Sequence, residues 1–204
     1  MQVIKKYFKD LTSEQYNQFS NLPALYNYWN KKINVISRKD IQHVEIHHIL
    51  HSLSIAKVID FKDKTSILDV GTGGGFPGIP LAILYPKCNF ILIDSVAKKI
   101  KVVDNIIEEI GLKNSTTLNL RVENLNQKFD FIVSRAVTNM SKFKSYVKGK
   151  IIKEQNNNLN NGILYLKGGD LVQELHNIEH KIYNISDFFD EKFFDSKKII
   201  HIKN

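Results

Sequence analysis

The sequence predicts an α/β fold in which helices cover both faces of a mostly parallel, seven-stranded sheet. Three observations lead to this fold: seven short apolar runs, helical segments between most of them, and a glycine-rich turn directly after the first run. Parallel strands need crossover connections, usually helices, so buried runs that alternate with helices favour a parallel sheet. We expect residues 1–60 to form a helical N-terminal extension and residues 61–204 to form one compact domain.

The helical extension is predicted from helix-start signals and from apolar spacing. Thr12 and Gln15 resemble a capping box, in which each side chain bonds the backbone N–H group of the other residue. Pro23 predicts a break or a new first turn, because proline lacks the N–H group that a helix interior needs. Asp40 is expected to cap a second helix that ends near Ile59. The apolar positions at helical spacing are Phe19, Leu22, Leu25, Tyr26 and Trp29, followed by Ile41, Val44, Ile49, Leu53 and Ala56.

The rest of the chain predicts strands and helices in alternation. Gly111 is expected to end a helix, because glycine readily adopts the left-handed conformation found there. The Asn-rich stretch 156–162 predicts a surface turn. The predicted strands are 66–70, 90–94, 116–120, 129–134, 163–167, 181–185 and 198–202, and the predicted helices are 77–84, 96–110 and 141–152.

The glycine-rich turn, residues 71–75, predicts a ligand that approaches the backbone closely. Glycines allow such an approach where a strand meets a helix, and the N–H groups at the helix start attract anions. A dinucleotide site is one interpretation, because Gly73, Gly75 and Gly78 have the spacing G-x-G-x-x-G. This frame lies two residues further from the strand than usual, and it contains Pro77, which removes a donor.

An S-adenosylmethionine site is the other interpretation of this turn. Such a site has an acid just before the glycines, as Asp69 is here, and a second acid at the end of the next strand, as Asp94 is. The second acid accepts hydrogen bonds from ribose hydroxyls. A nicotinamide enzyme also has an acid near that position, so Asp94 does not separate the two ligands. Loop capping is the structural alternative for both acids.

A resemblance to a known family rests on this same segment. The residues from Asp69 to Ala82, DVGTGGGFPGIPLA, are similar to the signature of the glucose-inhibited division protein B family, and the GFPGIP run is far more specific than a glycine loop alone. Other segments similar to the family occur along the chain in the family's order, two before this signature and four after it. They are Trp29–Ser37, His47–Leu53, Ile93–Ser95, Arg121–Glu123, Ser134–Val137 and Leu166–Gly168. The resemblance spans roughly residues 25 to 170.

The resemblance implies a Rossmann-like class I S-adenosylmethionine-dependent methyltransferase fold, with residues 61–204 as the methyltransferase domain. The family methylates N7 of a guanine in small-subunit (16S) ribosomal RNA. The expected methyl donor is therefore S-adenosyl-L-methionine, the expected partner is 16S ribosomal RNA or the 30S particle, and no metal is expected. The resemblance implies donor contacts at Gly71, Phe76, Val122, Glu123 and Arg135. By analogy with the wider superfamily, Asp94 is expected to accept from the ribose hydroxyls, and Gly73 of the same turn is a further candidate for cofactor binding.

The reaction implied by the resemblance needs no catalytic base. Guanine N7 already carries an in-plane lone pair, so positioning of the base is the expected source of catalysis. We therefore name no certain catalytic residue and keep Arg135 as a candidate for positioning. In A-form RNA the deep groove hides N7, which favours a loop or junction as the target. The candidates for RNA contact are Lys31, Lys32, Arg38 and Lys167.

The charge of the chain permits RNA binding without establishing it. The formal net charge is +8, but 26 of the 29 basic residues are lysines in a chain rich in Ile and Asn, a composition that an AT-rich coding sequence favours. A basic protein can also bind an anionic membrane. Against this background the three arginines stand out. Arg38 either contacts phosphate or lies in a solvated loop, and Arg121 either borders the cofactor or pairs with Glu123 or Asp130.

The remaining residue types exclude several other classes of protein. His43, His47 and His51 have a spacing that can hold zinc, but a packed or RNA-facing helix surface is the preferred interpretation. Cys88 is the single cysteine, which excludes an internal disulfide and a Cys-rich zinc site. No signal peptide or apolar run of about 18 residues is present, so we expect a cytoplasmic monomer without a membrane span.

Three other functions remain open from the sequence. A small-molecule methyltransferase would have a closed pocket and no dependence on RNA. A nicotinamide oxidoreductase would bind NADH, which a fluorescence titration detects. A non-catalytic RNA-binding module on the same fold would bind the methyl donor without turnover.

Overall fold

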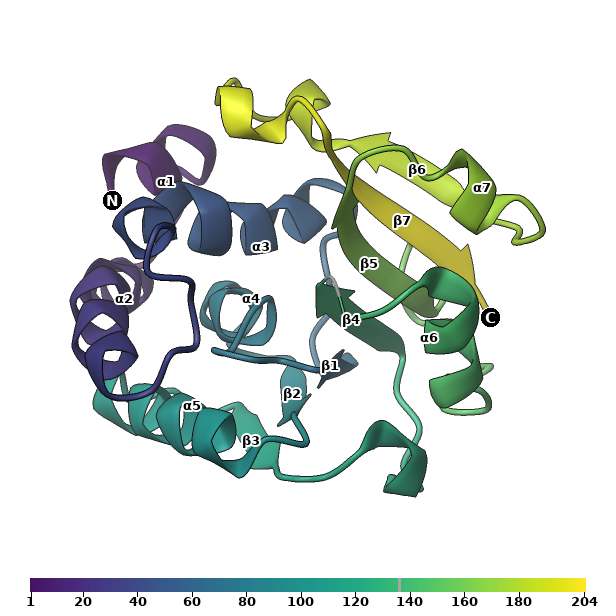
Figure 1. The fold of residues 1–204 in the computed structure, drawn as a ribbon, viewed down its shortest axis with the longest axis horizontal. Coiled ribbons are helices and arrows are strands. Elements are labelled where there is room, and N and C mark those ends of the chain that lie inside the picture. The colour runs from purple at the N-terminus through teal and green to yellow at the C-terminus, as the bar shows by residue number, and fades with distance from the viewer. Residues whose placement is uncertain (136) are drawn as a thin grey trace.

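The computed structural model describes residues 1–135 and 137–204 (Figure 1). Ala136, within the predicted Ser134–Val137 motif, lies outside the described residues. A seven-stranded sheet has the order β3-β2-β1-β4-β5-β7-β6. The strands are β1 (Ser66–Val70), β2 (Asn89–Ile93), β3 (Ser115–Leu118), β4 (Phe131–Arg135), β5 (Gly162–Gly168), β6 (Lys181–Asn184) and β7 (Lys197–Lys203).

The sheet is mostly parallel, as predicted. Strands β1 to β5 run parallel to one another, and β7 runs antiparallel to both β5 and β6. The chain adds β2 and β3 on one side of β1 and then returns to place β4 on the other side. This reversal opens a crevice beyond the carboxyl ends of β1 and β4, where open parallel sheets bind their ligands.

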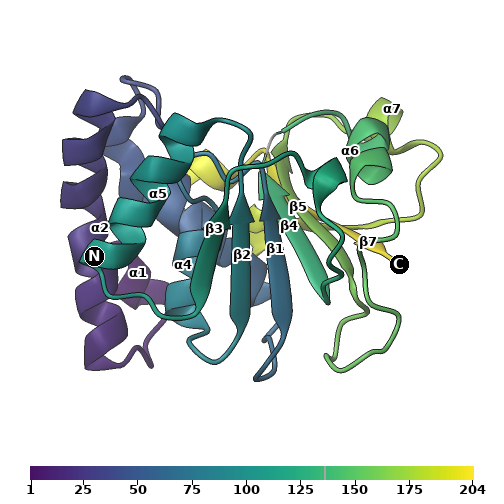
Figure 2. The ribbon, with the colours of Figure 1, turned by 90° about the horizontal axis from the view of Figure 1, so that it is seen from below.

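Helices cover both faces of the sheet, and the two coverings differ in size (Figures 1 and 2). One face carries α2, α4, α5 and the helical segment 41–57, whereas the other carries the short helices α6 and α7. The helices are α1 (Gln2–Tyr7), α2 (Ser13–Lys32), α3 (His51–Leu53), α4 (Gly78–Leu84), α5 (Ala97–Glu109), α6 (Met140–Tyr146) and α7 (Val172–Leu175). Within the described residues, no helix combines the length and the apolar character that a membrane crossing requires.

The start of α2 agrees with the sequence, but its interior does not. Thr12 and Gln15 form the predicted capping box, with both reciprocal bonds present. The predicted break at Pro23 is wrong, because α2 continues through it. Proline costs a helix interior about 3 kcal/mol. Phe19 and Tyr26, which are fully buried on either side of it, hold the helix against the core and offset that cost.

The second predicted helix is a series of short helical pieces. Residues 41–57 pass through 3-10, π, α and 3-10 turns in succession. The predicted cap at Asp40 is wrong, because its carboxylate makes no capping bond and instead contacts the rings of His47 and His48. Packing against distant residues sets the conformation of this segment. Ile49, a predicted apolar position, is fully buried in the core shared with the sheet.

The remaining elements match the sequence with small shifts. Helix α5 ends before Gly111, which has φ +67° as expected. Helix α6 stops at Tyr146, well before the predicted end at 152, because the chain then forms a parallel bridge between Phe129 and Ile151. The Asn-rich turn is mostly exposed, but Asn161 is fully buried and donates to the carbonyls of Ile152 and Glu154. Helix α7 was not predicted.

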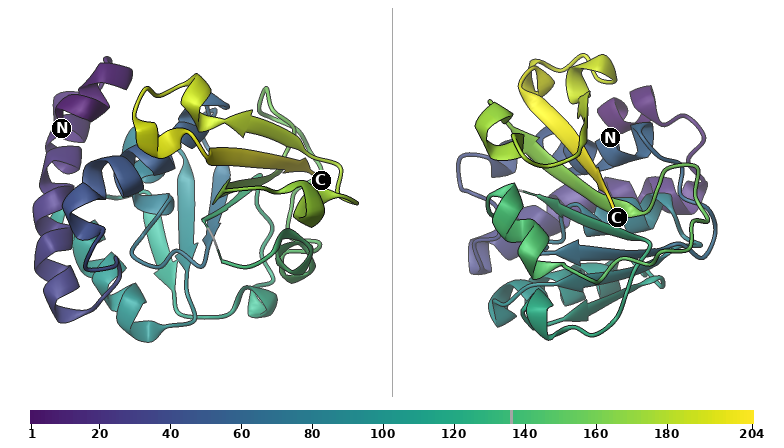
Figure 3. Two further views of the ribbon diagram at one scale, coloured as in Figure 1. Left: turned by 45° about the horizontal axis from the view of Figure 1, so that its top comes forward. Right: turned by 90° about the vertical axis from the view of Figure 1, so that its right-hand side faces the viewer.

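The first helix packs against a segment from the far end of the chain. Residues 185–194, between β6 and β7, cross back toward α1 (Figure 3). The ring of Tyr7 lies 4.6 Å from that of Phe189, and its hydroxyl donates to Glu191 at 2.9 Å and accepts from the backbone N–H of Asp190 at 2.9 Å. The helical N-terminal residues therefore share one hydrophobic core with the sheet and with this segment.

Candidate functional site

A cleft of about 470 Å³ lies beyond the carboxyl ends of β1, β2 and β4. All seven residues that the sequence predicted as donor contacts line it, namely Gly71, Gly73, Phe76, Asp94, Val122, Glu123 and Arg135. They come from four separate segments of the chain, which the sheet brings together at one edge. The volume lies in the range of about 300–1,000 Å³ that is typical of small-molecule sites.

The glycine turn forms one wall of this cleft. Gly71 and Gly73 have φ values of +67° and +60°, which L side chains rarely adopt. A Cβ at Gly71 would also lie 2.5 Å from Cγ2 of Val137, which lines the cleft as well. Gly78 has a different role, because a Cβ there would lie 2.7 Å from both Asp69 and Leu92. Its lack of a side chain lets α4 pack on the sheet, so the dinucleotide spacing that includes it reflects packing.

Asp69 anchors the turn from below and does not line the cleft. Its Oδ2 atom accepts from the hydroxyl of Thr72 at 2.6 Å and from the N–H of Gly78 at 2.8 Å. The side chain is fully buried, and this burial raises its pKa to about 7. Of the two sequence interpretations of Asp69, the structural one, loop capping, fits these contacts.

Asp94 holds the same turn from the cleft side. One carboxylate oxygen accepts from the N–H of Gly73 at 3.0 Å, and the other accepts from the N–H of Val96 at 2.9 Å. A carboxylate has about four acceptor positions, so two remain for a ligand. The side chain is 7% exposed and lines the cleft, so it can accept hydrogen bonds from ligand hydroxyls.

Arg135 enters the cleft from the end of β4. Its guanidinium lies 5.0 Å from the centre of the Phe76 ring and donates to Nδ1 of His48 at 2.8 Å and to the carbonyl of His47 at 3.2 Å. Burial lowers its pKa to about 10, so the group stays positively charged at neutral pH. The Phe76 ring stacks in turn on Tyr26, at a centroid distance of 4.7 Å.

The other residues of the cleft provide an apolar lining and an exposed rim. Val122 is buried in the lining, whereas Glu123 and Arg121 are exposed on the short turn after β3. Within the described residues Arg121 makes no salt bridge, so neither of its suggested partners, Glu123 and Asp130, is engaged. Asp130 instead accepts from the backbone N–H and hydroxyl of Ser66.

Sequence reasoning missed several residues that line the cleft, including Val35, Lys99 and Tyr146. A signal was present for Val35, because it lies inside the family-like segment Trp29–Ser37. Lys99, near the start of α5, gave no signal that separates a cleft residue from a lysine on a solvated helix face. Tyr146 gave no signal, because helix spacing does not show which end of α6 reaches the cleft.

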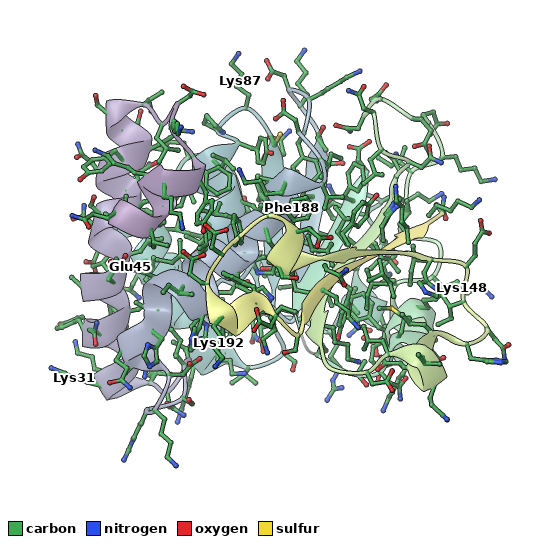
Figure 4. The ribbon with its side chains drawn as sticks, turned by 90° about the horizontal axis from the view of Figure 1, so that it is seen from above. Lys31, Glu45, Lys87, Lys148, Phe188 and Lys192 are labelled. Carbon is green, nitrogen blue, oxygen red and sulfur yellow. The ribbon has the colours of Figure 1, made fainter. Side chains whose placement is uncertain are left out.

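The candidates for RNA contact fall into two places. Lys31 and Lys32 end α2 and are exposed, as is Arg38 on the loop that follows (Figure 4 labels Lys31). This loop reaches the cleft through Val35. Lys167 lies apart at the end of β5, where its ammonium contacts the carboxylate of Glu174 and is largely shielded from solvent.

Three histidines of residues 43–51, namely His47, His48 and His51, pack within the protein, whereas His43 is exposed. His47 stacks on Phe193 at a centroid distance of 3.8 Å, and His51 is buried against Phe193 and Phe194. Burial lowers the pKa of His51 well below its usual value. Across residues 1–135 and 137–204, no three His, Cys, Asp or Glu side chains are grouped as a metal site requires.

Comparison with known proteins gives matches along nearly the whole chain. Residues 15–199 match the family model GidB, rRNA small subunit methyltransferase G. The chain is 55% identical to Ribosomal RNA small subunit methyltransferase G of Christiangramia forsetii, over 99% of this chain and 96% of that protein. It is 56% identical to the protein of the same name from Flavobacterium psychrophilum, over 99% and 97%.

A solved structure supports the fold. A SAM-dependent methyltransferase from Aquifex aeolicus superposes with a TM-score of 0.56 at 15% identity, over 75% of this chain and 89% of that one. With the strand order of the sheet, this likeness shows a Rossmann-like class I methyltransferase fold, as the sequence resemblance implied.

Proposed function

Because this chain belongs to the rRNA small subunit methyltransferase G family, we propose that it transfers a methyl group from S-adenosylmethionine to N7 of a guanine in 16S ribosomal RNA. One observation carries this proposal beyond the family match. The seven residues predicted from the sequence to contact the methyl donor all line a single cleft at the topological reversal of the sheet.

The residues of the cleft fit the chemical groups of the donor. Asp94 has free acceptor positions for the two ribose hydroxyls, and the apolar lining at Val122 suits an adenine ring. The positively charged Arg135 suits the carboxylate of the donor's amino-acid end. Gly71 and Gly73 allow a close approach to the backbone of the turn. The donor supplies an electrophilic methyl group on a positively charged sulfur.

The proposed reaction needs little chemistry from the protein. The N7 lone pair of guanine forms the new C–N bond while the C–S bond breaks, and its electron pair goes to sulfur, so no proton has to be removed. The chain contributes by holding both reactants in line, which can supply roughly 7–11 kcal/mol in favourable cases.

The RNA contact surface that we propose consists of Lys31, Lys32, Arg38 and Lys39, at the end of α2 and on the loop after it. All four are exposed, and Tyr28 beside them is 52% exposed with Lys32 over its ring at 4.0 Å. Exposed aromatic and basic side chains together suit a single-stranded or splayed RNA segment. The loop adjoins the cleft, so bound RNA would lie close to the methyl donor. Lys167 is a weaker candidate because Glu174 engages it.

We propose that the protein works in the cytoplasm, where ribosomal particles assemble, and that it acts as a monomer. Its formal charge of +8 favours association with RNA in either free or particle form.

The test of this function uses purified protein, labelled S-adenosylmethionine and 30S particles from a bacterium that lacks its own enzyme of this family. The expected result is one equivalent of label per particle, recovered as 7-methylguanosine after nuclease digestion. Label in another nucleoside, or none in either 30S particles or free 16S RNA, contradicts the proposal. Parallel reactions on free RNA and on particles show which is the substrate.

The RNA contact surface is tested by a matched pair of triple variants. Lys31→Ala, Lys32→Ala and Arg38→Ala together should weaken RNA binding and lower the slope of log affinity against log salt by about two to three. The control replaces Lys62, Lys64 and Lys87, exposed at the opposite end of the sheet, with alanine (Figure 4 labels Lys87). Equal losses in both variants would mean that only net charge matters.

A further inference from the structure

A chain of hydrogen bonds leads from the RNA-side loop to the guanidinium in the cleft. Oδ2 of Asp40 lies 2.6 Å from Nε2 of His48, and Nδ1 of His48 lies 2.8 Å from a guanidinium nitrogen of Arg135. We propose that His48, oriented by Asp40, is a positioning residue that fixes the guanidinium of Arg135 for the methyl donor. This inference rests on the proposed function, in which Arg135 contacts that donor.

The contacts determine which nitrogen of the imidazole carries the proton. A guanidinium can only donate, so Nδ1 of His48 must accept from Arg135. Nε2 must then carry the proton, which it donates to the carboxylate of Asp40. Burial, followed by the charge of Arg135, lowers the pKa of His48 to about 4, so the ring is neutral at physiological pH. A neutral imidazole with this tautomer is the form that can accept from Arg135 and donate to Asp40 together.

Asp40 is held in place by a second histidine. Its Oδ1 atom lies 2.5 Å from Nδ1 of His47, whose ring stacks on Phe193. Although partial burial opposes ionisation, the hydrogen bonds from His47 and His48 lower the pKa of Asp40. The carboxylate is therefore charged at neutral pH and fixes the orientation of the His48 ring. These contacts explain why the carboxylate points into the protein and leaves the helix start uncapped.

The guanidinium of Arg135 is oriented without being neutralised. It is bounded by the His48 ring, the carbonyl of His47 and the face of Phe76, none of which carries a negative charge. Among the described residues it makes no salt bridge with an aspartate or glutamate. Its charge thus remains available to an anionic group in the cleft, and a donor that ends in a carboxylate provides one.

A purely structural role for His48 is the alternative, since its ring also packs 5.1 Å from that of Phe76. Two variants separate the roles. His48→Phe retains a ring against Phe76 and removes both hydrogen bonds. His48→Asn loses the ring and retains an acceptor oxygen near the position of Nδ1. If His48 positions Arg135, the asparagine variant should be the better enzyme; if His48 only packs, the phenylalanine variant should be.

The experiment measures S-adenosylmethionine affinity by calorimetry, KM for the donor and kcat on 30S particles, and the free energy of unfolding in urea. His48→Phe should raise the donor Kd and KM about tenfold with kcat changed less than threefold, because the hydrogen bond that orients Arg135 is lost. His48→Asn should stay within about threefold of the wild type in both constants. Unchanged donor affinity in His48→Phe overturns the inference, as does a loss that follows stability in both variants.

A double-mutant cycle shows whether His48 acts through Arg135. In an Arg135→Ala background, His48→Phe should reduce donor affinity by no more than about twofold, because the group that it orients is gone. A second tenfold loss in that background contradicts the inference. Failure of the proposed function has a different signature: the wild type would bind no donor, or would bind it and leave 30S particles unmethylated.

Discussion

The two sides of the cleft are built by different means. The turn wall, residues 69–78, is held mainly by hydrogen bonds to its own backbone, through the carboxylates of Asp69 and Asp94. The N-terminal wall, residues 26–51, is held by side chains: Asn30 folds the loop that ends in Asp40, and His48 connects that loop to Arg135. One wall depends on backbone conformation and the other on long-range side-chain contacts.

This difference has a consequence for substitutions. The turn wall leaves little room, because a Cβ at Gly78 or at Gly71 would approach a neighbour to within 2.7 Å or less. The N-terminal wall has exposed positions, such as Lys31 and Arg38, that can change without disturbing the cleft. Substitutions in the turn wall should therefore affect stability and donor binding. Substitutions in the N-terminal wall should affect the placement of Arg135 and of the RNA.

The largest effect is expected from the buried anchor of the turn wall. The pKa of Asp69 is about 7 in the folded protein against 3.8 for a free carboxyl group. Between these values the folded state binds one proton more than the unfolded state, so the free energy of unfolding falls as pH rises, by up to about 4 kcal/mol. Asp69→Asn should remove this loss.

Urea unfolding between pH 4 and pH 8 measures the effect of Asp69→Asn. The difference in stability between variant and wild type should grow in favour of the variant as pH rises from 4 to 7, and should level off above pH 7. His48 and His51, which have lowered pKa values, titrate in both proteins and cancel in the difference. Parallel stability profiles would show that the carboxyl of Asp69 does not resist ionisation.

The second effect concerns the carboxylate on the cleft side of the same wall. Asp94→Ala removes the acceptors of the Gly73 and Val96 N–H groups and the proposed partner of the ribose. Donor affinity should fall about 100-fold, equivalent to about 3 kcal/mol. Isothermal calorimetry with S-adenosylhomocysteine measures it. Asp63→Ala, at an exposed carboxylate on the opposite end of the sheet, serves as control, and equal affinities for all three proteins would remove Asp94 from the site.

The third effect probes the N-terminal wall. Asn30→Ala removes two bonds that the side chain accepts, from the N–H groups of Val35 and Ile36, and one that it donates to the carbonyl of Ile36. Unfolding free energy should fall by about 2 kcal/mol. Donor affinity should fall as well, because Val35 lines the cleft. The control Asn27→Ala loses one exposed bond to Pro23 and should change either quantity little. If the two variants behave alike, the wall does not depend on Asn30.

The smallest effect tests a direct contact between the two walls. The buried hydroxyl of Tyr26 donates to the carbonyl of Gly74 at 2.7 Å, and its ring stacks on Phe76. Tyr26→Phe keeps the ring and removes the hydrogen bond, which should lower stability by about 1 kcal/mol and leave donor affinity within about twofold. Thermal unfolding and calorimetry measure both quantities. A loss of donor affinity well beyond twofold would show that the walls are coupled through this bond.

The turn wall was largely predictable because its determinants are local. A short apolar strand, five residues of glycine-rich turn and a helix follow one another directly in the chain, and the strand order places Asp94 beside them. The pattern of short apolar runs also sufficed to predict all seven strands within a few residues. Local reasoning did not decide which of Asp69 and Asp94 caps the turn and which faces the cleft. The answer depends on which side of the turn each carboxylate occupies.

The N-terminal wall was less predictable because its contacts join distant residues. His48 and Arg135 are 87 positions apart, and no spacing rule connects them. The same limitation explains Pro23 and Asp40, where tertiary contacts overrode local signals for a break and for a cap. The family-like segments that contain His48 and Arg135 marked both residues, yet gave no sign that they meet.

The contact between Tyr7 and Glu191 has a consequence for the order in which the molecule is completed. These residues are separated by 184 positions, and the ring of Tyr7 also needs Phe189 to be covered. At synthesis rates of about 5–20 residues per second, α1 waits roughly 10 to 40 s for its partners after it leaves the ribosome. During that interval the side of Tyr7 that faces Phe189 has no partner, so the packing of α1 is completed only after residues 189–191 have emerged.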